Sequence, residues 1–245
     1  MQKTAHPIFN MALAHRGLHN EHIDENSMQA FKRAVEHGYG IELDVHATLD
    51  NKIVVMHDLS TLRTTGVDLD VTKCTYDELL GIDLLLTKTK IPLLEDVLTM
   101  VDGKVPVMIE IKVENKIPDN LLPAVLEVVN KFKHHGSIAV QAFNPFVVKN
   151  LRKAKTGVPV GQLMSDSLPG QSKMVHFMYR TLLVLLISKP DFFNYDVQYI
   201  SKKRIQRRRK KLPLITWTID TYEKYDCAKK FADNCIFEAI DIVKE

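Results

Sequence analysis

Charged side chains end several short apolar segments of the chain, where a buried strand would normally carry none. Glu42 and Asp44 are separated by one leucine, and because successive side chains of a strand point to opposite faces, these two carboxylates share a face. Glu110 ends a similar segment farther along the chain. Burying several carboxylates is costly unless a cation neutralises them. Three such oxygen ligands suit one divalent cation, Mg²⁺ or Ca²⁺, better than Zn²⁺.

Two histidines, His15 and His57, also end apolar segments. A neutral imidazole can accept a proton while an imidazolium donates one, so this pair could catalyse a displacement near neutral pH. The pattern leaves open which of the two is the base. Other histidines of the same region are interpreted as surface or supporting residues, namely His19, His22 and His46.

Positive charge lies close to these groups in the sequence. Arg16 follows His15, and Lys112 follows Glu110 by two positions. Guanidinium and ammonium groups bind phosphate oxygens, so the pattern indicates a phosphate-bearing ligand. Trp217, the only tryptophan, could form one wall of a pocket. Taken singly, these residues could equally be salt-bridged strand ends or core, but their shared position at segment ends favours a functional site.

The apolar pattern alternates between short β-branched runs and segments of helical period. The runs predict strands at residues 11–15, 39–46, 53–57, 105–111, 137–143, 158–163, 191–195 and 212–218. The other segments predict helices at residues 27–37, 94–101, 120–134, 145–155, 171–187, 201–211 and 222–232. About eight strand–helix units favour a closed (β/α)8 TIM barrel, in which the strand ends named above would meet at one mouth. No G-x-G-x-x-G follows the first strand, which counts against a dinucleotide-binding fold.

Composition and organisation indicate one globular domain spanning residues 1–245. Hydrophobic residues make up 45% and charged residues 26% of the chain, which excludes a disordered or collagen-like protein. No linker rich in Gly, Pro or Ser divides it. Residues 58–90 are long and polar and do not fit a strand–helix unit, so we expect an insertion there, after the second strand region and over the mouth of the barrel.

The remaining signals concern compartment and partners. Three scattered cysteines without C-x-x-C spacing predict neither disulfides nor a zinc–thiolate site. The first residues lack the apolar stretch of a signal peptide, and residues 182–187 are too short to cross a bilayer, so we expect a cytoplasmic protein.

A formal charge of +3 gives no reason to expect a nucleic-acid partner. Residues 202–211 include eight basic residues. We interpret them as a solvated outer helix, with weak contact to an anionic membrane as the alternative.

Several motifs follow one another in a specific order: His15-Arg16-Gly17, Glu25-Asn26-Ser27, residues 42–44, His57-Asp58, Arg63-Thr64-Thr65-Gly66, residues 91–96, residues 110–112 and Trp217-Thr218. This ordered set spans about 200 residues and closely resembles the glycerophosphodiester phosphodiesterase family. The resemblance implies a TIM barrel with a small insertion after the His-Asp motif. It also implies a divalent metal held by Glu42, Asp44 and Glu110, with His15 and His57 as the acid/base pair.

The reaction that the resemblance implies is hydrolysis of a glycerophosphodiester to glycerol 3-phosphate and an alcohol. The alternative is a lysophospholipase D or a sphingomyelinase-D-like phosphodiesterase acting on larger lipids, for which Leu84-Leu85-Leu86 could supply an apolar entrance. A phosphate binder without catalytic activity is a third interpretation. The chain departs from the family pattern at Ala142, where a serine is usual, and in the final strand at residues 233–238.

Overall fold

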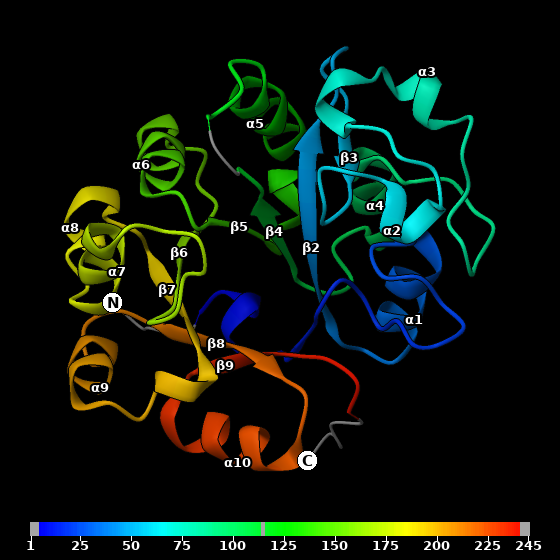
Figure 1. Cartoon of the computed structure of the whole chain (residues 1–245). Coiled ribbons are helices and arrows are strands. Elements are labelled where there is room, and N and C mark those ends of the chain that lie inside the picture. Colours follow the sequence, from blue (N-terminus) through cyan, green and yellow to red (C-terminus); the bar gives the residue numbers. More distant parts are fainter. Residues whose placement is uncertain (1–4, 114–115, 241–245) are drawn as a thin grey trace.

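The computed structural model describes residues 5–113 and 116–240. Eight parallel strands form a closed ring, with β1 paired to β2 on one side and to β9 on the other (Figure 1). They are β1 (Leu13–Ala14), β2 (Gly40–Ala47), β4 (Val107–Ile111), β5 (Ile138–Ala142), β6 (Val160–Met164), β7 (Phe192–Asp196), β8 (Leu214–Ile219) and β9 (Asn234–Phe237). The predicted (β/α)8 barrel is therefore confirmed.

One predicted barrel strand has a different role. The strand predicted at residues 53–57 is observed as β3 (Ile53–Val55), which pairs antiparallel with the end of β2. The link from β2 is a tight turn in which Thr48 N–H donates to Lys52 O and Asn51 adopts a φ of 64°. Parallel neighbours need a crossover of a dozen or more residues, so this short link can only make a hairpin. The eighth barrel strand is β9, which lies within residues 233–238, the final segment whose sequence differs from the usual pattern.

Helices surround the strands in chain order, from α1 through α5 and α6 to α10 (Figure 1). They are α1 (Met28–Glu36), α4 (Leu94–Val101), α5 (Leu121–Phe132), α6 (Pro145–Ala154), α7 (Lys173–Arg180), α8 (Val184–Ser188), α9 (Lys203–Arg209) and α10 (Tyr222–Phe231). The helix predicted over residues 171–187 is two helices, because Leu182 adopts a left-handed φ of 64° between α7 and α8. Among the described residues, no helix has the length and apolar character needed to span a bilayer.

Residues 58–90 form an excursion beside β3 and α4 (Figure 1). It contains α2 (Leu62–Thr65), the 3-10 helix η2 (Val71–Lys73) and α3 (Tyr76–Leu79). A small separate core holds it against β3, in which Val71, Leu79 and Leu84 pack with Val54 and Met56. This apolar burial holds the excursion against the barrel.

The barrel interior is apolar at one end and polar at the other. Leu13, Met108, Phe192 and Ile215 fill the amino-terminal end together with Ile8 of the 3-10 helix η1 (Pro7–Phe9). Figure 1 shows η1 in deep blue at the centre of the ring. The two remaining 3-10 helices, η3 (Lys133–His135) and η4 (Val197–Tyr199), lie between barrel elements. This plug therefore fills the interior of the barrel at the amino-terminal end, whereas the polar residues lie toward the carboxyl ends of the strands.

Candidate active site

Three carboxylates converge at the open end of the barrel. Glu42 and Asp44 share the inner face of β2, and Asp44 is in register with Glu110 on the neighbouring β4. One oxygen of each carboxylate lies within 4.8 Å of the others, and all three residues are buried. The predicted ligand set therefore comes together in space, with the oxygen-only chemistry that hard divalent cations prefer.

Two cations flank this cluster. Lys112 Nζ lies 2.9 Å from Glu110 Oε1 and 3.5 Å from Asp44 Oδ1. Arg16 Nε lies 3.5 Å from Asp44 Oδ2, and the backbone N–H of Arg16 donates to Glu42 Oε2 at 3.3 Å. Burial alone would lower the pKa of Lys112, but Glu110 and Asp44 raise it well above its usual value. Both cations are therefore charged and lie where a phosphate could meet them.

The carboxylates of β2 differ in their electrostatic surroundings. Burial raises the pKa of Glu42 well above its usual value, and repulsion from Asp44 and Glu110 adds to the effect. Burial would also raise the pKa of Asp44, but Lys112 is among the groups that bring it below its usual value. Asn26 Nδ2 donates to Asp44 Oδ2 at 3.0 Å. Glu42 is thus the member of the cluster that most lacks a compensating positive charge.

His15 stands at the end of β1, beside the last barrel strand. Its backbone N–H donates to Phe237 O at 2.9 Å, and its Nδ1 lies 2.6 Å from Glu238 Oε2. The hydrogen bond from His15, together with the His19 ring whose Nε2 lies 3.4 Å from Glu238 Oε1, holds the pKa of Glu238 well below its usual range. An ionised carboxylate at Nδ1 orients the ring and leaves Nε2 available for proton transfer.

His57 has an equivalent partner, its neighbour in sequence. His57 Nδ1 lies 2.6 Å from Asp58 Oδ1, and Arg63 Nε donates to Asp58 Oδ2 at 2.6 Å. Burial would raise the pKa of Asp58, but the hydrogen bonds from Arg63 and His57 lower it to about 2. Arg63 and Arg16 both donate to Glu25. A continuous set of charge-assisted hydrogen bonds therefore joins the insertion to the first strand end.

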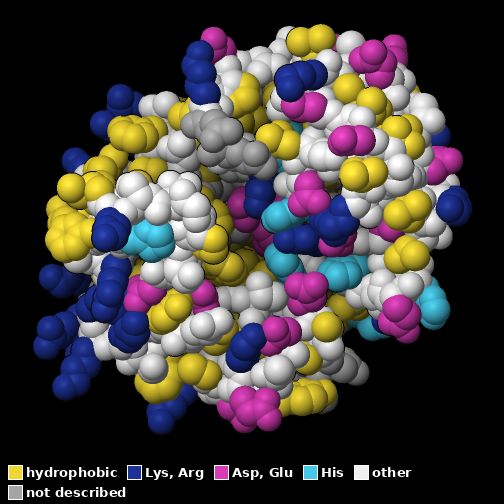
Figure 2. Space-filling view, viewed as in Figure 1, with side chains coloured by type: hydrophobic (Ala, Val, Ile, Leu, Met, Phe, Trp, Pro, Cys, Tyr) yellow, Lys and Arg dark blue, Asp and Glu magenta, His cyan; other side chains and the backbone are white. Residues whose placement is uncertain are grey.

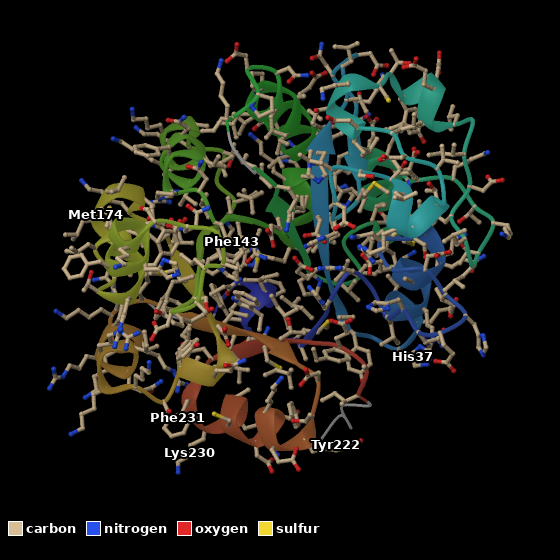
Figure 3. All side chains as sticks on the ribbon, viewed as in Figure 1. His37, Phe143, Met174, Tyr222, Lys230 and Phe231 are labelled. Carbon is tan, nitrogen blue, oxygen red and sulfur yellow. The ribbon has the colours of Figure 1, made fainter. Side chains whose placement is uncertain are left out.

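An open cavity of about 770 Å³ lies at this mouth, a size that suits a small ligand. His57, Lys112, Glu110 and Phe143 are among its lining residues. Figure 2 shows a hollow at the centre of this face, with acidic, basic and histidine side chains together at its edge. In Figure 3, Phe143 points toward the centre of the ring. The polar groups predicted from the sequence thus surround one opening.

Trp217 lies on β8 with its ring against the apolar interior of the barrel. It meets Phe143 edge to face, with ring centroids 5.6 Å apart. Its Nε1–H is buried and has no hydrogen-bond acceptor among the described residues. The ring therefore offers both an apolar wall and an unused donor at the level of the mouth.

A larger cavity, about 940 Å³, lies at the opposite end of the barrel. His6, Arg152, Lys155 and Lys211 are among its lining residues, and Asp191 is the one carboxylate that lines it among residues 5–113 and 116–240. Arg152 pairs with that carboxylate at 2.6 Å. The smaller cavity at the mouth is the candidate site, because it alone adjoins the carboxylates and histidines described above.

Sequence reasoning did not assign roles to the residues that orient the site. Asp58, Arg63 and Glu25 stood in the quoted motifs, but only the structure shows that they connect the two histidine regions. Glu238 pairs with a histidine 223 positions away. An acidic residue at the end of the last strand was the available signal, because the first and last strands of a closed barrel are neighbours.

A closed barrel with converging polar groups at the carboxyl ends of its strands has the layout of a (β/α)8 enzyme. The model of the glycerophosphoryl diester phosphodiesterase family matches residues 15–238. The chain therefore belongs to that family.

Relatives and solved structures agree. The chain is 31% identical over 172 residues to mouse lysophospholipase D GDPD1, covering 65% of this chain and 53% of that protein. It is 27% identical over 221 residues to a glycerophosphodiester phosphodiesterase of Caldanaerobacter subterraneus subsp. tengcongensis, covering 87% of each. The crystal structure of the Thermotoga maritima glycerophosphodiester phosphodiesterase superposes with a TM-score of 0.72 at 27% identity, covering 93% of each chain. The chain spans little more than half the length of several curated relatives, including the mouse protein.

Proposed function

We propose that this protein hydrolyses glycerophosphodiesters to glycerol 3-phosphate and an alcohol, with the help of one divalent cation. The observation that carries the proposal is the convergence of three buried carboxylates, two cations and two carboxylate-bound histidines at one barrel mouth. Family membership supports the same reaction. A small-molecule diester of this kind also suits the open cavity of about 770 Å³.

The cluster of Glu42, Asp44 and Glu110 fits a bound Mg²⁺ or Ca²⁺. Their oxygens lie within 4.8 Å of one another, and the raised pKa of Glu42, caused first by burial, indicates a buried carboxylate that lacks positive charge. When bound, the cation would withdraw charge from the phosphoryl oxygens. Both ions bind through carboxylate oxygens, so the donor set accommodates either.

The protein's own side chains supply the remaining chemistry. Lys112 and Arg16 neutralise the negative charge of the diester. One histidine takes a proton from the attacking group, which is either water or the substrate's glycerol hydroxyl, and the other gives a proton to the departing alcohol. His15 and His57 are suited to these roles because each has Nδ1 bound to a carboxylate. Attack by the glycerol hydroxyl would pass through a cyclic phosphate.

The proposal is tested by product release from a panel of water-soluble glycerophosphodiesters, with and without a chelator. We expect glycerol 3-phosphate and the free alcohol in the presence of Mg²⁺ or Ca²⁺, and almost none after chelation. Release of a glycerol and a phosphomonoester of the alcohol would mean that the other ester bond is cleaved. Unchanged turnover in the chelated protein would exclude the metal-dependent reaction.

A second candidate is lysophospholipase D activity on larger lipids. The insertion carries exposed apolar side chains at Leu62, Leu85 and Leu86, which could contact an acyl chain, and the mouse relative has that name. The same panel extended to lysophospholipids decides between the two. If lysophospholipids are cleaved faster than glycerophosphocholine, the larger lipid is the preferred substrate.

A further inference from the structure

Five large apolar side chains are exposed on the outer layer of helices. These side chains, called here the outer apolar row, are 41% to 68% exposed and comprise Phe146, Met174, Phe177, Leu183 and Leu186. In Figure 3, Met174 points away from the barrel. Isolated exposed apolar residues are ordinary, but a contiguous set on one side of a protein marks an interaction surface.

The helices that carry the row are neighbours. Phe146 lies on α6, which packs directly against α8, the helix that carries Leu186. Met174 and Phe177 lie on α7, which immediately precedes α8 in the chain. Figure 2 shows hydrophobic side chains gathered on the same side of the molecule as these helices.

The same side of the molecule is strongly basic. Residues 145–211, which run from α6 to α9, contain 15 Lys and Arg but only 3 Asp and Glu. The rest of the chain contains 18 basic and 27 acidic residues. The formal charge of +3 is therefore the sum of a positive segment and a negative remainder. Figure 2 shows Lys and Arg gathered below the apolar region on the same side of the molecule.

The basic residues of α9 adjoin the outer apolar row. Arg204 Nε donates to Arg180 O at 2.6 Å, which joins the start of α9 to the end of α7. Asp166 pairs with Lys202 and Arg204. Within residues 5–113 and 116–240, no carboxylate pairs with Lys203, Arg207 or Lys210, and these three are exposed. Their charge is available to an external partner.

We propose that this side of the protein, formed by the outer apolar row and the basic residues of α9, docks onto bilayers that contain anionic phospholipid. Basic residues near an anionic surface add electrostatic attraction, and apolar side chains between them can enter the boundary between headgroups and acyl chains. A nucleic acid would use the positive charge but would leave five exposed apolar side chains without a partner. The combination therefore favours a membrane surface.

The position of the docking side relative to the mouth adds to the argument. Gln171, just before α7, lines the mouth cavity together with His57 and Phe143. Tyr179 of α7 donates through its hydroxyl to Phe143 O at 2.5 Å. The helix that carries Met174 and Phe177 is thus fixed to the rim of the mouth. Docking by this side would hold the mouth close to the bilayer.

The test is flotation of the full chain with vesicles of phosphatidylcholine alone or of equimolar phosphatidylcholine and phosphatidylglycerol. Three forms are compared: the parent, an apolar variant (Met174→Ser, Phe177→Ser, Leu186→Ser) and a basic variant (Lys203→Gln, Arg207→Gln, Lys210→Gln). Matched controls remove the same side-chain types elsewhere. They are Leu49→Ser, Leu80→Ser, Tyr222→Ser and Lys32→Gln, Lys52→Gln, Lys104→Gln, all at exposed positions. Thermal unfolding and turnover of a water-soluble diester show that each variant is folded.

We expect the parent to float with the anionic vesicles and not with phosphatidylcholine, and added salt to weaken binding. Each removed basic residue should lower the partition coefficient about fivefold, and the apolar variant should lower it at least tenfold. Both controls should bind like the parent. Absence of parental binding, or equal loss in the controls, overturns the proposal. Full retention of binding by the apolar variant also overturns the proposal, because the surface would then be purely electrostatic and would suit a nucleic acid. Binding of a labelled duplex DNA would identify that partner.

Discussion

His15 and His57 are held in the same way although they come from different strands. Each has Nδ1 at 2.6 Å from a carboxylate, Glu238 for one and Asp58 for the other. Both carboxylates have a pKa below the usual value, because hydrogen bonds from the histidines and, for Asp58, from Arg63 favour the ionised form. Each imidazole is therefore oriented by a permanent negative charge and exposes its other nitrogen.

This arrangement predicts that His15→Ala and His57→Ala each lower kcat by about 10² or more, since each removes a proton-transfer group. The fold should persist, because both side chains lie at the mouth and not in the apolar core. His22→Ala is the matched control, because the His22 side chain is 82% exposed, and it should retain parental kcat. Turnover within about threefold of the parent in either mouth variant would mean that the histidine concerned is only structural.

The carboxylate partners predict a pH effect that assigns the two roles. The parent should show a bell-shaped pH–rate profile that reports the coupled site. Asp58→Asn or Glu238→Gln removes an anion beside one imidazolium, so the protonated ring is disfavoured. The limb governed by that histidine should move to lower pH. If Glu238→Gln moves the alkaline limb, His15 is the acid; if it moves the acid limb, His15 is the base. Unmoved limbs in both variants would contradict the pairing.

The residues proposed to react are recognisable in the sequence, whereas their hydrogen-bond partners are not. A carboxylate or histidine at the end of an apolar segment is visible because it breaks the pattern of that segment. Glu238 gives a weaker signal, because its role depends on the last strand closing next to the first. Trp217 was recognised as a possible wall, but its contact with Phe143 joins residues that are far apart in the sequence.

Helix α9 shows how basic residues in one run divide between structure and surface. Arg209 Nε and Nη2 lie 3.0 Å and 2.9 Å from Asp233 Oδ1, and its Nη2 donates to Ala232 O at 2.6 Å. Asp233 in turn accepts from the backbone N–H of Leu214 at 2.8 Å. Arg207, two positions earlier, is exposed. The sequence predicted a solvated outer helix, and this holds for only part of the run.

We therefore predict that Arg209→Gln lowers the free energy of unfolding by about 1–2 kcal/mol, because a partly buried, hydrogen-bonded ion pair next to β8 and β9 is lost. Arg207→Gln, on the same helix, should change it by less than about 0.5 kcal/mol. Urea unfolding of the two variants and the parent measures the difference. Equal stabilities of the two variants would show that the contact with Asp233 contributes nothing.

Two other elements show where a pattern is insufficient. The apolar run at residues 53–57 does contain a strand, β3, but this strand is antiparallel to β2. Its direction is set by the length of the preceding link, which here allows only a hairpin. The apolar period over residues 171–187 predicts one helix, yet Leu182 turns the chain, and α8 then packs against α6. Tertiary packing decides such breaks, and helical period does not report it.

At the scale of the whole molecule, the barrel separates three environments. Its amino-terminal end is filled by apolar side chains around Ile8, and its carboxyl end holds the charged groups of the mouth. Residues 145–211, from α6 to α9, contain 15 basic but only 3 acidic residues. The groups proposed to react thus share one opening. The buried carboxylate cluster should affect both the overall stability and the proposed chemistry.

Stability should therefore depend on cation and pH together. Burial raises the pKa of Glu42 above its usual value of about 4.5. The metal-free folded protein therefore keeps a proton on Glu42 at pH values at which the unfolded chain has released it. The metal-free protein thus loses stability as pH rises through that value toward the raised pKa of Glu42. A cation that binds the cluster favours the ionised carboxylate, so its affinity should rise over the same pH range.

Calorimetry at pH 5 to 8, with Mg²⁺ or Ca²⁺ or with a chelator, measures this linkage. We expect the cation to raise Tm, as any ligand selective for the folded state does, and the gain to grow with pH. Glu42→Gln keeps the shape of the side chain but removes its titration and its charge. In that variant the gain should shrink and lose most of its pH dependence, whereas Glu21→Gln, at a fully solvated site, should behave as the parent does. A gain in Tm that is equal in the parent and in Glu42→Gln would place the cation elsewhere on the protein and would separate metal binding from the three-carboxylate cluster.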